Sequence, residues 1–246
     1  MDATLKNSTE VHEQHVDING HIGEDEHIGR DLEYSAAYRW QHWLRAFSIV
    51  FLVATGFYLA VPAITPAATN EPTNFLYALF RSWHIIIGFV FIAAILLKSY
   101  LFIFAKKHSN ERAALLDVIN PIVWIKQLGF YLLITKHPKL RGVYNPMQFA
   151  AYAGFYIMAF GLIITGLILF VHVYHEGLGA ILYEPMRSIE VVLGGLSTVR
   201  ELHHILMWGV ILFVVVHIYI AVYNAVFIKE GTIDAIISGI KWHKRV

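Results

Sequence analysis

Residues 200–217, RELHHILMWGVILFVVVH, form an apolar run with histidines near both ends. An α-helix rises about 1.5 Å and turns about 100° per residue, so His203 and His217 lie roughly 21 Å apart along the helix and differ by about 40° around it. They therefore share one face, whereas His204 points about 140° away from His217. Ionisable side chains inside an apolar run are costly, which makes these histidines candidates for a functional role.

Three more stretches resemble this run in length and apolarity. A bilayer core about 30 Å thick needs roughly 20 apolar residues in a helix, and four segments qualify, at about 41–62, 83–105, 148–173 and 202–228. Charged residues make up 15% of the chain, against about 25% in soluble domains. We therefore expect an all-α integral membrane protein with a four-helix transmembrane bundle. The chain has no cysteine, which excludes disulfides, iron–sulfur ligation and zinc–thiolate sites within it.

The basic residues outside the spans predict their orientation. The connection 106–147 carries seven Lys and Arg residues and the tail after residue 228 carries four, whereas the loop 63–82 has one and the loop 174–201 has two. Cytoplasmic loops are enriched in Lys and Arg. Both termini and the connection 106–147 are therefore expected in the cytoplasm.

The predicted membrane domain, 39–228, lies between two polar tails. Residues 1–38 hold nine acidic residues against two basic ones and lack the apolar core of a signal peptide. We expect them to form an acidic, mobile cytoplasmic tail, although its four histidines could bind a metal. Residues 229–246 form a basic cytoplasmic tail. Within the long connection, the apolar stretch at about 113–135 is broken by Pro121, which favours an interfacial segment over a fifth span.

The first and second spans each supply one more histidine at a matching depth. His42 lies near the predicted inner end of the first span, and His84 near the predicted outer end of the second. Pairing His42 with His217 and His84 with His203 gives two stacked sites. Two neutral imidazoles suit a six-coordinate haem iron, whose porphyrin supplies four nitrogens, whereas zinc prefers more protein ligands. Hydrogen-bonded packing histidines are the alternative, which four residues at two matched depths disfavour.

Arginines and glycines accompany these histidines. Arg39, Arg81 and Arg200 each precede a predicted ligand by three residues, on the same helix face and one turn nearer to water. Their guanidinium groups could bind haem propionates through paired hydrogen bonds, although arginines at span ends also serve as plain interfacial anchors. Small residues would also let a macrocycle or a neighbouring helix approach closely, and they include Gly56, Gly154, Gly161 and Gly166.

Several motifs occur together in this chain. They are R-x-x-H-W at 39–43 with Thr55-Gly56, R-x-x-H-x-x-x-G at 81–88, Asn145-Pro146 and R-x-x-H-H at 200–204. Over about residues 36–230 the chain resembles the cytochrome b subunit of membrane-bound nickel–iron hydrogenases. Tyr144 departs from that pattern, because many relatives have histidine before Asn-Pro.

The resemblance implies two haem b groups and a multi-pass place in the bacterial cytoplasmic (inner) membrane, in contact with lipid. It also implies a partner small subunit with iron–sulfur clusters and a large subunit with the nickel–iron centre, and no nucleic acid. The chain would be the quinone-reducing electron-transfer subunit of a hydrogen:quinone oxidoreductase, with hydrogen activation left to its partners. Electrons would enter at the outer site, cross to the inner site and reduce quinone near the cytoplasmic surface.

Quinone reduction needs polar groups that bind the carbonyls and relay protons. Candidates gather at the inner opening of the third span, namely His137, Tyr144, Asn145 and Gln148. Asn145 before Pro146 also fits a plain helix N-cap. Two other interpretations stay open. One is the equivalent cytochrome b subunit of a formate dehydrogenase or other periplasmic oxidoreductase, and the other is a haem-free membrane anchor or transporter.

Overall fold

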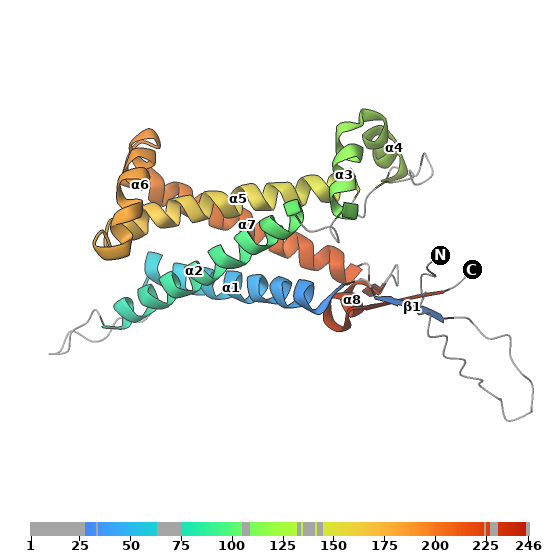
Figure 1. The fold of residues 1–246 in the computed structure, drawn as a ribbon, viewed down its shortest axis with the longest axis horizontal. Helices are drawn as coiled ribbons and strands as arrows, with labels where there is room; N and C mark the ends of the chain where they lie inside the picture. The colour runs from blue at the N-terminus through green and yellow to red at the C-terminus, as the bar shows by residue number, and fades with distance from the viewer. Residues whose placement is uncertain are drawn as a thin grey trace, which may run out of the picture. The chain divides into compact units, whose positions relative to one another are not determined.

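The computed structural model describes residues 28–32, 34–62, 75–104, 109–131, 134, 141, 145–223, 225–226 and 231–244. Within them, four helices are long and apolar enough to cross a membrane, which confirms the predicted four-helix membrane fold. They are α1 (Ala36–Ala60), α2 (Phe75–Phe104), α5 (Pro146–Val171) and α7 (Leu196–Tyr223) (Figure 1).

The long helices begin before the apolar runs that predicted them. α2 begins at Phe75 and not near residue 83, and α7 begins at Leu196 and not near residue 202. Hydrophobicity marks only the part of a helix that fits the bilayer core, whereas backbone hydrogen bonding continues the helix past it. As a result, His84 and His203 lie two turns inside their helices and not at the first turn.

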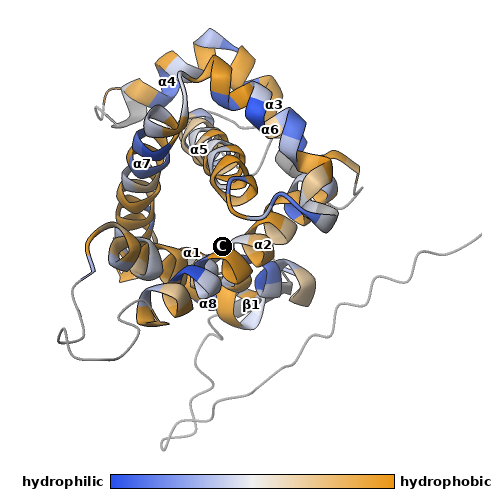
Figure 2. Cartoon of the chain, turned by 90° about the vertical axis from the view of Figure 1, so that its left-hand side faces the viewer, coloured by the Kyte–Doolittle hydropathy of each residue, from blue (hydrophilic) through white to orange (hydrophobic). Residues whose placement is uncertain are grey.

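The core of this bundle is small, and its fully buried centre comes from three of the long helices. It is centred on Phe91 and Ile95 of α2, Phe155 and Ala159 of α5, and Val210 of α7. Many other large apolar side chains are exposed, including Trp208, at 57%. Figure 2 shows hydrophobic residues on all sides of the long helices. A helix that is apolar all round is typical of a membrane span.

Two short helices occupy the connection between α2 and α5. α3 (Ser109–Ile119) and α4 (Pro121–Tyr131) are separated only by Asn120. Asn120 Oδ1 accepts a hydrogen bond from Ile122 N at 3.0 Å, and Pro121 needs no partner because it has no N–H. Each helix has 11 residues and is therefore about 16 Å long, too short to cross a core of about 30 Å.

A further helix, α6 (Ala180–Val192), lies in the loop between the third and fourth spans and was not predicted. A 3₁₀ turn, η2 (Gly177–Gly179), precedes it. A Cβ atom on Gly179 would lie 2.2 Å from Tyr174 O, so only glycine fits there. Gly194 and Gly195 follow α6 with φ of 91° and 93°, values that side chains disfavour and that turn the chain into α7.

The end segments form a unit of their own, which comprises residues 1–35 and 221–246. β1 (Ile28–Leu32) pairs antiparallel with β2 (Ile240–Lys244), with Ile28 opposite Lys244 and Leu32 opposite Ile240. The short helix α8 (Thr232–Ser238) leads into β2. Both segments are expected from the sequence to be tails, and this ribbon was not predicted. The histidines of residues 1–27 lie outside the described residues.

Candidate functional site

The structure brings together both histidine pairs that the helical spacing predicts. His42 of α1 faces His217 of α7, with ring centroids 6.3 Å apart and planes at 45°. His84 of α2 faces His203 of α7, with centroids 6.5 Å apart and planes at 64°. α7 thus contributes one imidazole to each pair, near its two ends. We call these the His42–His217 pair and the His84–His203 pair.

The separation within each pair suits two axial ligands of one iron. A metal-bound imidazole nitrogen lies about 2.0–2.1 Å from the metal and about 1.1 Å from its own ring centroid, so two rings across one iron have centroids about 6.3 Å apart. The observed 6.3 and 6.5 Å agree with this value. Two imidazoles hydrogen-bonded to each other would lie closer together, with a ring nitrogen of one about 3 Å from a ring nitrogen of the other. The residues present therefore fit a haem.

Threonine hydroxyls contact both rings of the His84–His203 pair. Thr55 Oγ1 of α1 lies 2.9 Å from His84 Nδ1. Thr165 Oγ1 of α5 lies 2.8 Å from His203 Nδ1. These threonine contacts were not predicted from the sequence. The signal that could have indicated them is the dipeptide Thr-Gly, which occurs in both the first and the third span.

The glycines predicted to allow close approach have three kinds of surroundings. A Cβ atom on Gly56 would lie 3.4 Å from His84 Cε1, and one on Gly166 would lie 3.5 Å from His203 Cε1, so both flank the rings of this pair. A Cβ atom on Gly161 would lie 2.8 Å from Leu206 Cδ1, so this glycine serves the packing of α5 on α7. Gly154 has nothing within 4 Å of such an atom and shows no close approach to protein.

The His42–His217 pair has different surroundings. Phe213 stacks on His217, with centroids 5.8 Å apart and planes at 12°. Trp43 meets His42 edge-on at 5.5 Å. Within the described part of the chain, His42 Nδ1 is buried without a hydrogen-bond partner, and so are both amide atoms of Gln41. Buried polar atoms are normally hydrogen-bonded, so the Gln41 amide indicates room for a polar group of a bound molecule.

Arg45 is a charged residue inside the first span and was not among the predicted site residues. It is three residues after His42, and its Nη1 donates a hydrogen bond to Tyr156 OH of α5 at 2.7 Å. Its Nε donates to Gln41 O at 3.3 Å. The charge is therefore partly buried and tied to two helices. Its position in an apolar run, one turn from a predicted ligand, was the available signal.

The three arginines predicted to bind propionates lie one turn before their histidines but differ in exposure. Arg39 and Arg81 are partly buried, and Arg200 is exposed. Arg81 Nε is buried and has no hydrogen-bond partner among the described residues, which suits an anionic group of a bound molecule. The backbone O of Arg200 accepts a hydrogen bond from His204 Nδ1 at 2.9 Å.

Two of the four quinone candidates form the N-terminal cap of α5. Asn145 Oδ1 accepts from Gln148 N at 2.9 Å, and Gln148 Oε1 accepts from Asn145 N at 3.2 Å, which is a capping box. Pro146 occupies the first helical position. The helix-cap interpretation of Asn145 is thereby confirmed. His137 and Tyr144 lie outside the described residues.

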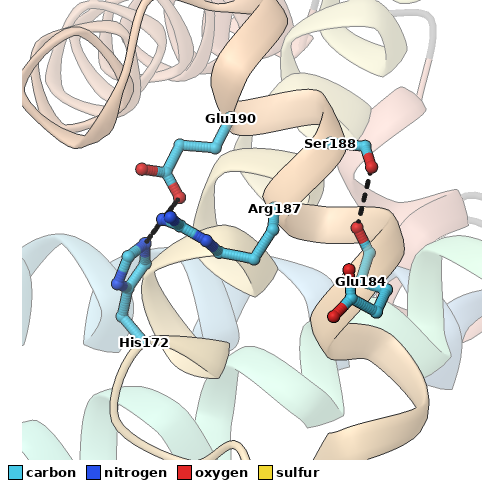
Figure 3. A network of polar contacts seen from close by, with 5 residues as sticks. All are labelled: His172, Glu184, Arg187, Ser188 and Glu190. Atoms are coloured by element: carbon cyan, nitrogen blue, oxygen red, sulfur yellow. Dashed lines mark hydrogen bonds and ion pairs between the residues drawn. The ribbon is translucent and has the colours of Figure 1, made fainter.

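A separate polar network joins the end of α5 to α6 (Figure 3). His172 Nε2 donates to Glu190 Oε2 at 2.5 Å, and Arg187 Nη1 donates to the same oxygen at 2.6 Å. The hydrogen bond from His172, together with that from Arg187, holds the pKa of the buried Glu190 carboxyl below its usual value, while burial opposes this shift. The contact between His172 and Glu190 connects the end of α5 to α6.

Facing histidine pairs on long apolar helices define a class of protein, the multi-pass membrane proteins with paired imidazoles. The family model described as prokaryotic cytochrome b561 matches residues 33–239, and the chain belongs to this family. Membership, with the four spans, makes it a multi-pass protein of the bacterial inner membrane, and a b-type cytochrome implies haem b.

The curated relatives have closely related names. A probable Ni/Fe-hydrogenase B-type cytochrome subunit of Azotobacter vinelandii is 30% identical over 219 residues, covering 86% of this chain and 88% of the relative. One of Bradyrhizobium diazoefficiens is 29% identical, covering 84% and 83%. A probable Ni/Fe-hydrogenase 1 B-type cytochrome subunit of Escherichia coli K12 is 26% identical, covering 86% and 90%. The resemblance inferred from the motifs is confirmed.

Proposed function

We propose that this chain is the di-haem cytochrome b subunit of a membrane-bound nickel–iron hydrogenase and that it anchors the hydrogenase and delivers its electrons to quinone. The observation that carries the proposal is the pair of facing histidine sites at the two ends of α7. The names of the relatives favour hydrogenase as the partner over formate dehydrogenase. The small iron–sulfur subunit and the large nickel–iron subunit of the hydrogenase would lie on the outer face of the membrane.

Each residue type has a defined task in this proposal. His42 with His217, and His84 with His203, would hold two haem b groups, which supply one-electron chemistry through their iron when bound. His203 and His217 are 14 residues apart on α7, so the two sites would lie roughly 21 Å apart along the helix. This distance is most of the thickness of a bilayer core of about 30 Å. Arg39, Arg81 and Arg200 would bind carboxylates at the edges of these sites. The apolar helices exclude water around them.

Haem content tests the sites directly. Purified full-length protein is expected to contain about two haems per chain, with spectra of low-spin iron bound by two histidines, because four histidines make two complete axial pairs. His42→Ala and His84→Ala are each expected to lower the content to about one. His175→Ala is the control, since His175 is exposed beyond the end of α5. A wild-type value of one or none contradicts the pairing.

Quinone reduction is proposed near the start of α5, where Asn145 and Gln148 lie, with His137 and Tyr144 as further candidates. The capping box complicates a test by alanine, because loss of an N-cap costs about 1 kcal/mol of stability on its own. Asp is as good an N-cap as Asn, and Glu fits the third position of a capping box as well as Gln does. Asn145→Asp and Gln148→Glu therefore keep the cap while they remove the amide donor.

These two variants are expected to bind two haems that hydrogen still reduces through the partner subunits, but to reduce quinone more slowly. Steady-state quinone reduction by the intact complex, measured beside haem reduction by hydrogen, checks both points. A normal rate of quinone reduction in both variants would place the quinone site elsewhere. If hydrogen no longer reduces the haems, electron transfer is blocked before the haems and not between the haems and quinone, which contradicts the proposal.

A further inference from the structure

The two threonines at the His84–His203 pair are arranged alike. Thr55 lies on α1 and contacts His84 of the following helix, and Thr165 lies on α5 and contacts His203 of α7. In each case the next residue is glycine, and a Cβ atom on it would lie 3.4 or 3.5 Å from Cε1 of the same ring. Two unrelated stretches of chain thus present the same Thr-Gly unit to the two imidazoles.

The hydrogen bonds of the hydroxyls decide the protonation of the rings. Thr55 Oγ1 lies 2.7 Å from Phe51 O, and Thr165 Oγ1 lies 2.7 Å from Gly161 O. A carbonyl oxygen only accepts, so each hydroxyl uses its single hydrogen there. The hydroxyl oxygen must then accept from the ring. His84 and His203 therefore carry hydrogen on Nδ1, which leaves the lone pair of each Nε2 free for a metal.

We propose that Thr55 and Thr165 are positioning residues that fix the tautomer and the orientation of His84 and His203 as haem ligands. This inference rests on the proposed function, in which that pair binds haem. An outer hydrogen bond of this kind holds a ligating imidazole in place and raises its basicity. The two threonines would thus favour the ferric state of the haem at this pair and lower its reduction potential.

The other pair provides an internal comparison. His42 Nδ1 is buried and has no hydrogen-bond partner among the described residues, and Arg45 lies one turn along the same helix. A missing acceptor leaves the ring less basic and favours the ferrous state, whereas arginines lie near both pairs and do not distinguish them. The potential of the His84–His203 haem is therefore set below that of the His42–His217 haem, and removal of either threonine hydroxyl should affect only the lower potential.

The experiment is a potentiometric titration of the full-length, haem-containing protein, with low-temperature paramagnetic resonance of the ferric haems. Thr55→Val and Thr165→Val remove a hydroxyl at nearly constant volume, and Thr55→Ser and Thr165→Ser restore it. Ser48→Ala is the matched control, because Ser48 is buried on α1 and its Oγ donates to Leu44 O at 2.7 Å in the same way. Haem content is measured in every variant.

Both valine variants are expected to raise the lower of the two midpoint potentials and to shift the ferric signal of that haem, while the serine variants and Ser48→Ala match wild type. The valine variants could instead lose one haem while the serine variants keep both haems at the wild-type potentials. This result would also support the proposal, because it would show that the hydroxyl holds the ring in place. Unchanged potentials and signals in the valine variants would overturn the proposal, and so would serine variants that behave like valine. Two haems retained after His84→Ala would instead refute the ligand assignment itself.

Discussion

At the scale of single residues, two adjacent histidines show how helical geometry separates a candidate ligand from a surface group. His203 reaches across to α5, where its Nδ1 is hydrogen-bonded to Thr165, and its ring faces His84. His204 is exposed, and its Nδ1 donates to Arg200 O one turn earlier in its own helix. One step along the chain rotates the side chain by about 100°, which is enough to change its environment completely.

We therefore expect His203→Ala to lose one of the two haems and His204→Ala to keep both. His203 has an opposing imidazole at ligand distance, whereas the bond of His204 to its own backbone makes a local contribution of only about 1 kcal/mol. Haem quantitation per chain, with absorbance spectra of the reduced and oxidised forms, checks the two variants side by side. Loss of haem from His204→Ala alone would show that His204, and not His203, is the ligand.

At the scale of elements, the turn from α5 into α6 depends on one buried carboxylate. Glu190 of α6 receives hydrogen bonds from His172, just after α5, and from Arg187 one turn earlier in α6 (Figure 3). The contact to His172 ties two helices together, and Gly179 allows the close approach to Tyr174 O between them. Because these bonds hold the pKa of Glu190 below its usual 4.5, the charged form stabilises the folded state.

The sign of this linkage predicts a pH dependence. A carboxyl with a lowered folded-state pKa stabilises the fold fully above its unfolded pKa, and the contribution is lost as pH falls through the folded pKa. Glu190→Gln should therefore unfold at a lower temperature than wild type at pH 7, and the difference should shrink below about pH 4.5. Thermal unfolding in detergent from pH 7 to pH 3 measures this.

The matched control is Glu184→Gln in the same helix. Glu184 is exposed, and its backbone O accepts a hydrogen bond from Ser188 Oγ at 3.0 Å. This variant should unfold as wild type does at every pH. If the unfolding temperature of Glu190→Gln stays below that of wild type by a constant amount down to pH 3, the shape of Glu190, and not its charge, accounts for its role.

At the scale of the whole molecule, charge in the connecting segments predicts the direction in which the spans run. The connection 106–147 carries seven of the 19 Lys and Arg residues, whereas the loops 63–82 and 174–201 together carry three. Lys and Arg are retained on the cytoplasmic side during insertion. The orientation decides which histidine pair faces the hydrogenase and which faces the quinone site, so it is central to the proposed electron path.

Both termini are accordingly expected in the cytoplasm, with the His84–His203 pair toward the outside. A reporter that fluoresces only in the cytoplasm should be bright when fused to either terminus. Alkaline phosphatase, which is active only outside, should be active after insertion in the loop 174–201 and inactive at the C-terminus. The reverse pattern would invert the membrane orientation and place the His42–His217 pair next to the hydrogenase.

The sequence by itself predicted the four spans and both facing histidine pairs. The spans and the common face of His203 and His217 depend on local quantities, namely the length of apolar runs and the fixed rotation per helical residue. The partners His42 and His84 followed from topology, because the direction of each span sets the depth of its histidine. The capping box at Asn145 is also local, because its partners are three residues apart.

Tertiary structure alone decided the contacts made between distant segments. The Thr55–His84 and Thr165–His203 hydrogen bonds join residues 29 and 38 positions apart, and the pairing of β1 with β2 joins the two end segments. Arg45 and Tyr156 are 111 positions apart. The side of a helix that meets a given neighbour is set by how all the helices pack against each other. A periodic pattern identifies the face of one helix, but it does not specify which side chain of another helix will meet it.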